Sequence, residues 1–273
     1  MTCPNIDGTR GYGGCIFCDG GSGYFTQKNL TVTKQLELEY QRISAKNGDV
    51  PIVAYFQANT NTYAPVDKLR KIYNEALDFP AVSGISIGTR ADCLADDVIE
   101  YLSELNTQTN LTVELGLQTI HNSTLEYINR GYEHKKFCEG FSKLKKRKIR
   151  TCLHIINGLP FETDKMMLET AKEVARLSPE AVKIQMLHII KGTRLEKIYN
   201  DGLELLSADE YIDIVVKQLE YLPPETVIER ITGDGDKSKL IAPMWSANKI
   251  AVLGGIDKRQ AQLDSIQGKK YEL

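Results

Sequence analysis

Residues 84–118 read GISIGTRADCLADDVIEYLSELNTQTNLTVELGLQ and contain an apolar run, a helical pattern and a second apolar run, in that order. The two apolar runs, Gly84 to Gly88 and Leu111 to Leu117, have the length of buried strands. Between them, Asp96 to Leu105 places its apolar side chains at helical spacing. A strand, a helix and a strand in this order predict a parallel βαβ unit.

The same alternation continues on both sides of this unit. Further strands are expected at residues 51–55, 151–156, 182–187 and 226–231, and helices at 34–46, 66–77, 123–129, 134–148, 165–177 and 208–222. Ser123 with Glu126 and Ser207 with Glu210 have the spacing of capping boxes. Because connections between parallel strands have one hand, about six repeats must form either a curled barrel or an open sheet covered on both faces.

The strand ends favour the barrel. Polar side chains stand where five of the strands stop: Gln57 and Asn59, Thr89 and Arg90, Gln118, Asn157, and His188. Polar residues are common in any loop, but their recurrence at successive strand ends is typical of a barrel rim, where side chains from several strands meet. The chain is therefore expected to be an α/β protein with a partial (β/α)6 TIM-like barrel, an N-terminal loop and a small C-terminal extension.

Composition limits the function. The 273 residues are 42% hydrophobic and 26% charged, and the net charge of −2 argues against a uniformly basic nucleic-acid binder. No apolar run approaches the roughly 18 residues of a membrane span, and no signal peptide precedes Cys3. Six cysteines in such a chain indicate a reducing compartment. We therefore expect a cytoplasmic protein without a membrane partner.

Three cysteines form a C-x11-C-x2-C pattern at the start of the chain, in the stretch TCPNIDGTRGYGGCIFC of residues 2–18. The glycines between Cys3 and Cys15 allow the backbone to fold back, so that three thiolates can reach one centre. Structural zinc needs four ligands, and the first histidine is as distant as His121. A 4Fe-4S cluster with one open iron is favoured, while zinc with a distant fourth ligand and a redox pair at Cys15 and Cys18 stay open.

A family resemblance covers most of the chain. The cysteine stretch, YFQANTNTYAP (55–65), GISIGTRADCL (84–94), VELGLQT (113–119), INRGY (128–132), HIINGLP (154–160) and APMWSANK (242–249) together resemble the radical S-adenosylmethionine enzymes. The long first cysteine gap is similar to a bacterial family related to the Elongator catalytic subunit. The resemblance implies a radical core at residues 1–205, with a cluster loop at 3–18, and an associated region at 206–273. Family members usually carry a few dozen residues before the first cysteine, which implies either a truncated start or a barrel that closes differently.

The resemblance also implies the site. Cys3, Cys15 and Cys18 would hold a 4Fe-4S cluster, whose fourth iron takes S-adenosylmethionine so that an electron can release a 5′-deoxyadenosyl radical. The residues expected to hold this cofactor are Gln57, Asn59, Thr60, Arg90, Glu114, Gln118, Arg130 and Asn157. Glu114 is expected beside Arg90 or Arg130, where an ion pair that only closes the barrel is the alternative role. Gly158 would let the backbone approach adenine.

Other residues have plainer expected roles. Cys93, Cys138 and Cys152 are predicted to be small core residues, and Cys93 is the candidate for a second reactive thiol. His188 is either a substrate-side residue or a buried structural histidine. The basic run Lys143, Lys145, Lys146, Arg147, Lys148 and Arg150 either contacts phosphates beside the rim or forms a solvated helix end.

Relatives of the Elongator subunit act on wobble uridines, so the resemblance implies a tRNA substrate and an electron donor such as flavodoxin or ferredoxin. A radical enzyme acting on a small metabolite or a protein is the alternative, for which the near-neutral net charge is the best support. A non-enzymatic zinc-binding module is the third interpretation.

Overall fold

The computed structural model describes residues 1–20, 26–27, 29–57, 59–233, 235 and 237–272. Its main sheet has six parallel strands in the order β1-β2-β3-β4-β5-β7. Their bounds are Ile52–Phe56, Val82–Thr89, Asn110–Gln118, Arg150–Asn157, Ala181–Met186 and Val227–Arg230. The parallel order and the six strands confirm the predicted α/β partial barrel.

The helices alternate with these strands, as the periodicity of the sequence predicts. Their bounds are α1 Val32–Asn47, α2 Val66–Leu77, α3 Asp96–Gln108, α4 Asn122–Tyr127, α5 His134–Lys146, α6 Asp164–Leu177, α7 Arg194–Asn200, α8 Ala208–Tyr221 and α9 Lys249–Gln262. Two short 3-10 turns, η1 at Ala91–Cys93 and η2 at Met244–Ala247, complete the description. None of the described helices is long and apolar enough to cross a membrane.

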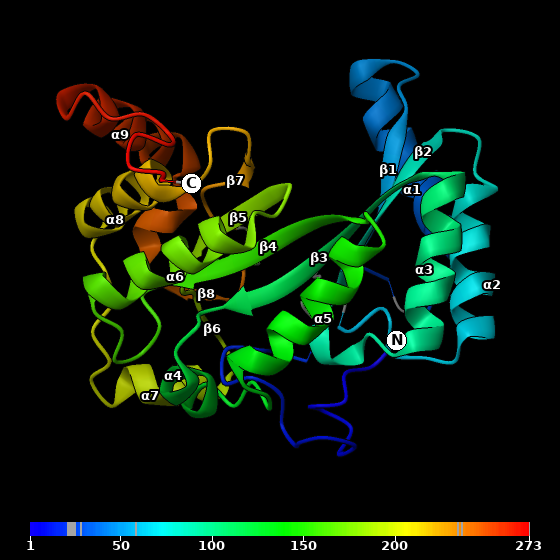
Figure 1. Ribbon diagram of the computed structural model, residues 1–273, viewed down its shortest axis with the longest axis horizontal. Coiled ribbons are helices and arrows are strands. Elements are labelled where there is room, and N and C mark those ends of the chain that lie inside the picture. Colours follow the sequence, from blue (N-terminus) through cyan, green and yellow to red (C-terminus); the bar gives the residue numbers. More distant parts are fainter. Residues whose placement is uncertain (21–25, 28, 58, 234, 236, 273) are drawn as a thin grey trace.

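The sheet curls into a half-barrel. Tyr55 in β1 and Lys183 in β5 are separated by four strand spacings, or about 19 Å in a flat sheet. The Lys183 ammonium nevertheless lies 4.8 Å from the centre of the Tyr55 ring. The two side chains therefore meet across a concave face, and the helices pack on the convex face (Figure 1).

The main core fills the space between sheet and helices and positions the rim. It includes fully buried Leu69 and Tyr73 of α2, and Phe137 and Leu144 of α5. Helix α5 also contains Gly140, where an added Cβ would stand 2.2 Å from the carbonyl oxygen of Ala91. Since nothing larger than glycine fits there, α5 packs directly against η1, the turn that follows Arg90 at the end of β2.

A second, smaller core lies under the N-terminal loop. Ile16, between Cys15 and Cys18, is buried against Ile128, Leu195 and neighbouring apolar side chains. A two-stranded antiparallel sheet, β6 Ile189–Ile190 and β8 Leu240–Ala242, also contributes to it. The cysteine loop is thereby anchored to the barrel by apolar packing.

One of the two predicted capping boxes is present. Ser207 caps α8 with both hydrogen bonds of the box to and from Glu210. The other prediction is wrong, because α4 begins at Asn122 with His121 at the cap, so that Ser123 lies inside the first turn.

The basic run extends away from the rim. Helix α5 runs back along the sheet and ends shortly before Arg150, the first residue of β4, so the later members of the run lie toward the amino ends of the strands. Lys143, the first member, still donates to the Leu94 carbonyl at 3.0 Å, just after the turn η1. Three of its cations have carboxylate partners, Lys143 with Asp96, Lys145 with Glu180, and Arg150 with Glu229. The prediction that basic residues lie beside the rim is wrong for the members from Lys145 onward, since a helix that starts at the rim ends toward the opposite face.

Candidate active site

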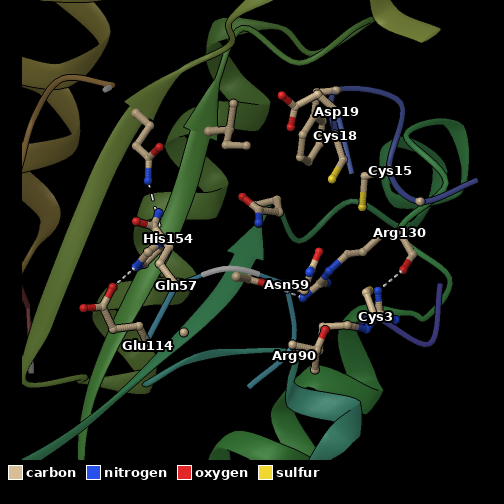
Figure 2. Close-up of a pocket in the computed structure, with 18 of the residues that line it drawn as sticks. Cys3, Cys15, Cys18, Asp19, Gln57, Asn59, Arg90, Glu114, Arg130 and His154 are labelled. Atoms are coloured by element: carbon tan, nitrogen blue, oxygen red, sulfur yellow. Dashed lines mark hydrogen bonds and ion pairs between the residues drawn. The ribbon is translucent and has the colours of Figure 1, made fainter. Parts of the chain in front are cut away.

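One cavity of about 360 Å³ opens at the carboxyl ends of the strands (Figure 2). Ten of the eleven predicted site residues line it: Cys3, Cys15, Cys18, Gln57, Asn59, Thr60, Arg90, Glu114, Gln118 and Arg130. The topology thus brings together residues from the N-terminal loop and from three strand ends. The cavity has a thiol end, with the three cysteines, Arg90 and Arg130, and a lumen end around Glu114 and His154, where Gln57 is drawn beside His154.

Asn157 is the residue that the structure does not bring to the cavity. It is 2% exposed at the end of β4, and its amide forms two hydrogen bonds of 2.8 Å with the Gln218 amide of α8. The side chain therefore faces the helix layer. Gly158 adopts a positive φ of 81°, and the nearest atoms to an added Cβ belong to Leu206.

The cysteine loop is held by two asparagines that the sequence analysis missed. The Asn129 amide donates to the carbonyl oxygens of Tyr12 at 3.0 Å and Gly14 at 2.7 Å. In return, the Asn5 amide donates to the Asn129 carbonyl at 2.6 Å. Asn129 has a φ of 53°, in the left-handed region that asparagine tolerates better than most residues. The INRGY stretch of residues 128–132 could have indicated this role, since it places Asn129 directly before Arg130.

The CIFC turn of residues 15–18 presents its sulfurs by burying Ile16, one of the two residues between them. The Ile16 amide donates to the Ile128 carbonyl at 3.0 Å, and the Ile16 carbonyl accepts from the Leu195 amide at 2.9 Å. Ile16 itself is 5% exposed. With this side chain fixed in the second core, Cys15 and Cys18 turn toward the cavity, on the same side as Cys3 (Figure 2).

The spacing of the thiols bears on the metal. Among the described residues, the groups whose ligand atoms all lie within 4.8 Å of one another do not include the three cysteines. Tetrahedral zinc with bonds of about 2.3 Å would bring sulfurs to about 3.8 Å from each other. The wider arrangement suits a larger centre such as an iron–sulfur cluster.

Arg90 is fixed in place by a carboxylate. Its guanidinium donates to both oxygens of Asp92, at 2.9 and 3.0 Å, and to the Arg130 carbonyl at 2.9 Å. Arg10 from the cysteine loop also pairs with Asp92, at 2.8 Å. Burial by itself raises the pKa of Asp92, but the hydrogen bonds and charges of Arg90 and Arg10 outweigh it and lower that pKa. Arg90 therefore brings a rigid positive charge to the thiol end.

Arg130 is the buried cation of this end. It is 3% exposed, and its Nη2 donates to the Gly116 carbonyl and, at 2.7 Å, to the Tyr132 hydroxyl. The guanidinium lies 4.0 Å from the centre of the Tyr132 ring. Its Nη1 has no hydrogen-bond partner among the described residues. A buried, unsatisfied charged donor is costly, so Arg130 is suited to an anionic group bound in the cavity.

The thiol pKa also fits a bound centre. Burial raises the pKa of Cys15 to about 11, while the charges of Arg90 and Arg130 act in the opposite direction. Without a metal this thiol is therefore protonated at neutral pH. Metal coordination supplies the positive charge that deprotonates such a thiol.

Glu114 lies at the lumen end and has other partners than predicted. His154 Nε2 lies 2.6 Å from Oε2, Lys183 Nζ lies 2.5 Å from the same oxygen, and the Ser86 hydroxyl donates to Oε1 at 2.6 Å. The Tyr55 hydroxyl completes the set at 2.9 Å. The prediction that Glu114 pairs with Arg90 or Arg130 is wrong. Glu114 faces the barrel interior, where Lys183 of β5 reaches it, whereas Arg90 and Arg130 lie at the thiol end.

These contacts control the titration of Glu114. Burial alone raises its pKa, but the hydrogen bond and charge of His154 and the charge of Lys183 outweigh that effect and lower the pKa well below its ordinary value. Glu114 is thus an anion at neutral pH. Neither His154 nor Lys183 was predicted, although both occupy strand positions that alternate with core residues.

The remaining cysteines differ from one another. Cys93 and Cys152 are buried, as predicted. Burial and the charge of Asp92 raise the pKa of Cys93 to about 12, which does not fit a reactive thiol. Cys138 is half-buried and packs against the edge of the main core, so its prediction as a core residue is confirmed only in part. Its sulfur lies 3.4 Å from His134 Nε2 and 3.9 Å from Glu173.

His188 lies at the cavity wall, where its Nε2 is 3.1 Å from the Ser246 hydroxyl. Gly233 lies against the imidazole, because an added Cβ there would stand 2.3 Å from the ring. The histidine is thus held between β6 and the 3-10 turn η2.

Comparison with known proteins identifies this arrangement. Residues 8–174 match the Radical SAM superfamily, and residues 179–262 match the Radical_SAM C-terminal domain. The chain belongs to the Radical SAM superfamily. Members of this superfamily are enzymes that use a 4Fe-4S cluster and S-adenosylmethionine, together with a reductant.

Relatives place the chain more closely. It is 50% identical to YtqA of Bacillus subtilis over 273 residues, which cover 99% of this chain and 85% of that protein. It is 28% identical to the tRNA uridine(34) acetyltransferase of Methanocaldococcus jannaschii over 173 residues, or 62% of this chain and 31% of that protein. The chain is also similar to the solved structure of Elp3 from Methanocaldococcus infernus. The alignment covers 86% of this chain and 59% of the Elp3 chain, with a TM-score of 0.70 and 17% sequence identity. That likeness confirms the fold.

Proposed function

We propose that this radical S-adenosylmethionine enzyme modifies the side chain of a tRNA wobble uridine. The observation that supports it best is the similarity of the catalytic region to a tRNA uridine(34) acetyltransferase, across 62% of the chain. The shared half-barrel with Elp3 is consistent with this function. An open cavity at the strand ends could admit an extruded base, as enzymes that act on nucleobases require.

In this proposal the thiol end holds both cofactors. Cys3, Cys15 and Cys18 ligate the cluster, while Gln57, Asn59, Thr60, Arg90, Gln118 and Arg130 surround S-adenosylmethionine. When bound, the cluster supplies the electron that breaks the sulfonium carbon–sulfur bond and yields a 5′-deoxyadenosyl radical. Arg130 offers its unpaired Nη1 to a carboxylate, and Arg90, braced by Asp92, supplies a second charge.

Asn157 and Glu114 have different places in this proposal. Asn157 does not line the cavity, so it would act through the Gln218 contact that holds the end of β4. Glu114 organises the lumen end, below the cofactors. We also propose the division into a radical core at residues 1–205 and an associated region at 206–273, a cytoplasmic location, and flavodoxin or ferredoxin as the reductant.

A small metabolite or a protein is the second candidate substrate. The position of the basic run favours it, since most of the run lies toward the opposite face from the cavity and three of its six cations have carboxylate partners. Binding of RNA must therefore depend on other residues of the rim.

The test compares tRNA from cells with and without the gene. Reconstituted protein receives S-adenosylmethionine, dithionite and each tRNA pool under anaerobic conditions, and 5′-deoxyadenosine is measured over time. We expect tRNA from deleted cells to stimulate its formation and to change mass at the wobble uridine, whereas tRNA from normal cells does neither. The Cys15→Ala protein is the matched control and should leave both pools unchanged.

Identical nucleoside profiles in the two cell types, with no stimulation by either tRNA pool, would reject the RNA substrate and favour the second candidate. The metal content of anaerobically purified protein distinguishes both radical-enzyme candidates from the zinc-binding module. Iron supports a radical enzyme, and zinc supports the module.

A further inference from the structure

Arg230 is a cation at the lumen end that the cofactors do not use. It is the last residue of β7, it is half-buried, and it lines the cavity. Its Cα is aligned with that of Lys183 in β5, just after a register shift between the two strands. Lys183 reaches Glu114 inside the barrel, and Arg230 lines the same cavity as Glu114. Arg230 therefore also faces the barrel interior.

The charge of Arg230 is felt inside the barrel. Burial and the neighbouring Glu114 both raise the pKa of Tyr55, and the positive charge of Arg230 acts in the opposite direction. Tyr55 belongs to β1, at the far edge of the sheet. The curl thus brings Arg230 and Tyr55, from the two edge strands of the sheet, to the lining of one cavity.

The other charges near Arg230 have partners. Lys183 lies 2.5 Å from Glu114 and 3.6 Å from Glu229, and Glu229 also lies 3.1 Å from Arg150 at the amino end of β4. No carboxylate of the described residues lies within the 4.0 Å ion-pair distance of Arg230. Arg230 is therefore a cation without an ion-pair partner among the described residues, on the strand next to that of Lys183, and an anion bound there would offset its charge.

The cofactor cannot supply this anion at both ends of the cavity. S-adenosylmethionine carries one carboxylate, and in the proposed function the thiol end would hold it through the cluster and Arg130, whose Nη1 has no hydrogen-bond partner among the described residues. Arg230 lies at the other end, with His154 and Gln185 as fellow lining residues. The Gln185 amide lies 3.5 Å from His154 Nδ1, so a ligand that enters can compete for its hydrogen bonds.

We propose that Arg230 and Gln185 form a substrate-anchoring site that binds one carboxylate carried by the substrate. The site rests on the proposed function only in that a substrate must enter the lumen end beside S-adenosylmethionine. A single leftover positive charge matches a carboxylate monoanion. A phosphate dianion would exceed it and would meet the Glu114 carboxylate. The planar fork of arginine also suits two-point binding of a carboxylate.

The direct test uses acetate as the probe and does not need RNA. Cluster-containing protein is kept oxidised, so that no cleavage occurs, and is saturated with S-adenosylmethionine to fill the thiol end. Line broadening of ¹³C-labelled acetate then reports the remaining carboxylate site. We expect Arg230→Gln to reduce the broadening at least fivefold and Arg230→Lys to give an intermediate value. The surface variant Arg42→Gln, whose cation pairs with Glu39 on α1, should match the native protein.

Equal broadening in native and Arg230→Gln protein of the same thermal midpoint would overturn the proposal. Competition with unlabelled inorganic phosphate distinguishes a carboxylate site from a phosphate site. We expect phosphate to displace labelled acetate at least tenfold more weakly than unlabelled acetate displaces it. Stronger displacement by phosphate would overturn the carboxylate assignment in favour of a phosphate.

A second measurement keeps this site distinct from the tRNA proposal. The ratio of tRNA-stimulated to tRNA-free cleavage should fall at least tenfold in Arg230→Gln, with tRNA from gene-deleted cells as the probe. Acetate binding that depends on Arg230, without any stimulation by tRNA in native protein, would reject the RNA substrate and support the carboxylate site. Stimulation that is unchanged in Arg230→Gln would overturn the site and support the RNA substrate.

Discussion

The two ends of the cavity are built in opposite ways. Apart from Arg230, the lumen end consists of strand side chains whose charges satisfy one another, as Glu114 does with His154 and Lys183. The thiol end consists of loop residues, where Arg130 Nη1 has no hydrogen-bond partner among the described residues and Cys15 has a pKa of about 11. The Glu114 cluster is complete as folded protein, whereas the thiol end is completed by what it binds. Substitutions in the Glu114 cluster should therefore alter folding, and those at the thiol end should alter the cofactor.

The largest effect is expected from Cys15→Ala. Reconstituted native protein should hold close to four irons and four sulfides per chain, as a 4Fe-4S cluster requires. The variant should hold none, because one iron loses its ligand at the buried CIFC turn. Iron and sulfide analysis checks this, and urea unfolding of the two metal-free proteins should agree within about 1 kcal/mol. A full cluster in the variant would show that the ligand assignment is wrong.

At the lumen end, Glu114→Ala should lower the free energy of unfolding by about 3–5 kcal/mol, since it leaves Lys183 buried without its anion. Urea titration of the metal-free protein measures it. The double variant Glu114→Gln with Lys183→Met removes both charges and should recover most of the loss. A Glu114→Ala protein as stable as the native one would contradict the division between the two ends.

The pH dependence sharpens the same point. The pKa of Glu114 is lower in the folded protein than its ordinary value of 4.5, so its contribution to stability is present above pH 4.5 and is lost as the pH falls below it. One such group changes the free energy of unfolding by at most about 1.4 kcal/mol per pH unit. Unfolding midpoints between pH 3 and 6 should therefore fall more steeply for native protein than for the Glu114→Gln, Lys183→Met double variant. If the midpoints of the two proteins fall equally with pH, the loss of stability in acid comes from carboxylates other than Glu114.

A smaller effect is expected at the thiol end from Arg90→Ala. Reductive cleavage of S-adenosylmethionine should slow by about tenfold, or about 1.4 kcal/mol, because a positive charge held beside the cofactor is lost. The matched control is Arg70→Ala on the outer helix α2, whose partner is Glu104. If the Arg90 and Arg70 variants cleave at the same rate, the cofactor lies elsewhere on the rim.

The smallest effect is expected outside both ends. Lys146, Arg147 and Lys148 are the exposed members of the basic run, at the amino ends of the strands. Their replacement by glutamine should change stability by less than about 0.5 kcal/mol and leave cleavage unchanged, because no partner is removed. Affinity for tRNA at two salt concentrations completes the measurement. A flatter salt dependence in the triple variant would mean that RNA reaches around to this face.

The sequence by itself determined the repeating strands and helices, the half-barrel and the cysteine motif. These follow from local patterns, since apolar periodicity and cysteine spacing involve residues that are close along the chain. Strand ends also share one rim in any parallel barrel, which is why ten of the eleven predicted site residues line the cavity.

Only the tertiary structure decided which charge meets which. Glu114 is closer in sequence to Arg90 and Arg130 than to Lys183, yet the curl of the sheet turns it toward Lys183 across the barrel interior. The same curl brings Arg230 into the cavity, where no carboxylate of the described residues pairs with it. The Asn157 side chain turns to Gln218, and the later part of the basic run lies toward the opposite face, because side-chain direction and helix direction depend on the assembled layers. Pairing of charges depends on distance in space, and distance along the chain does not encode it.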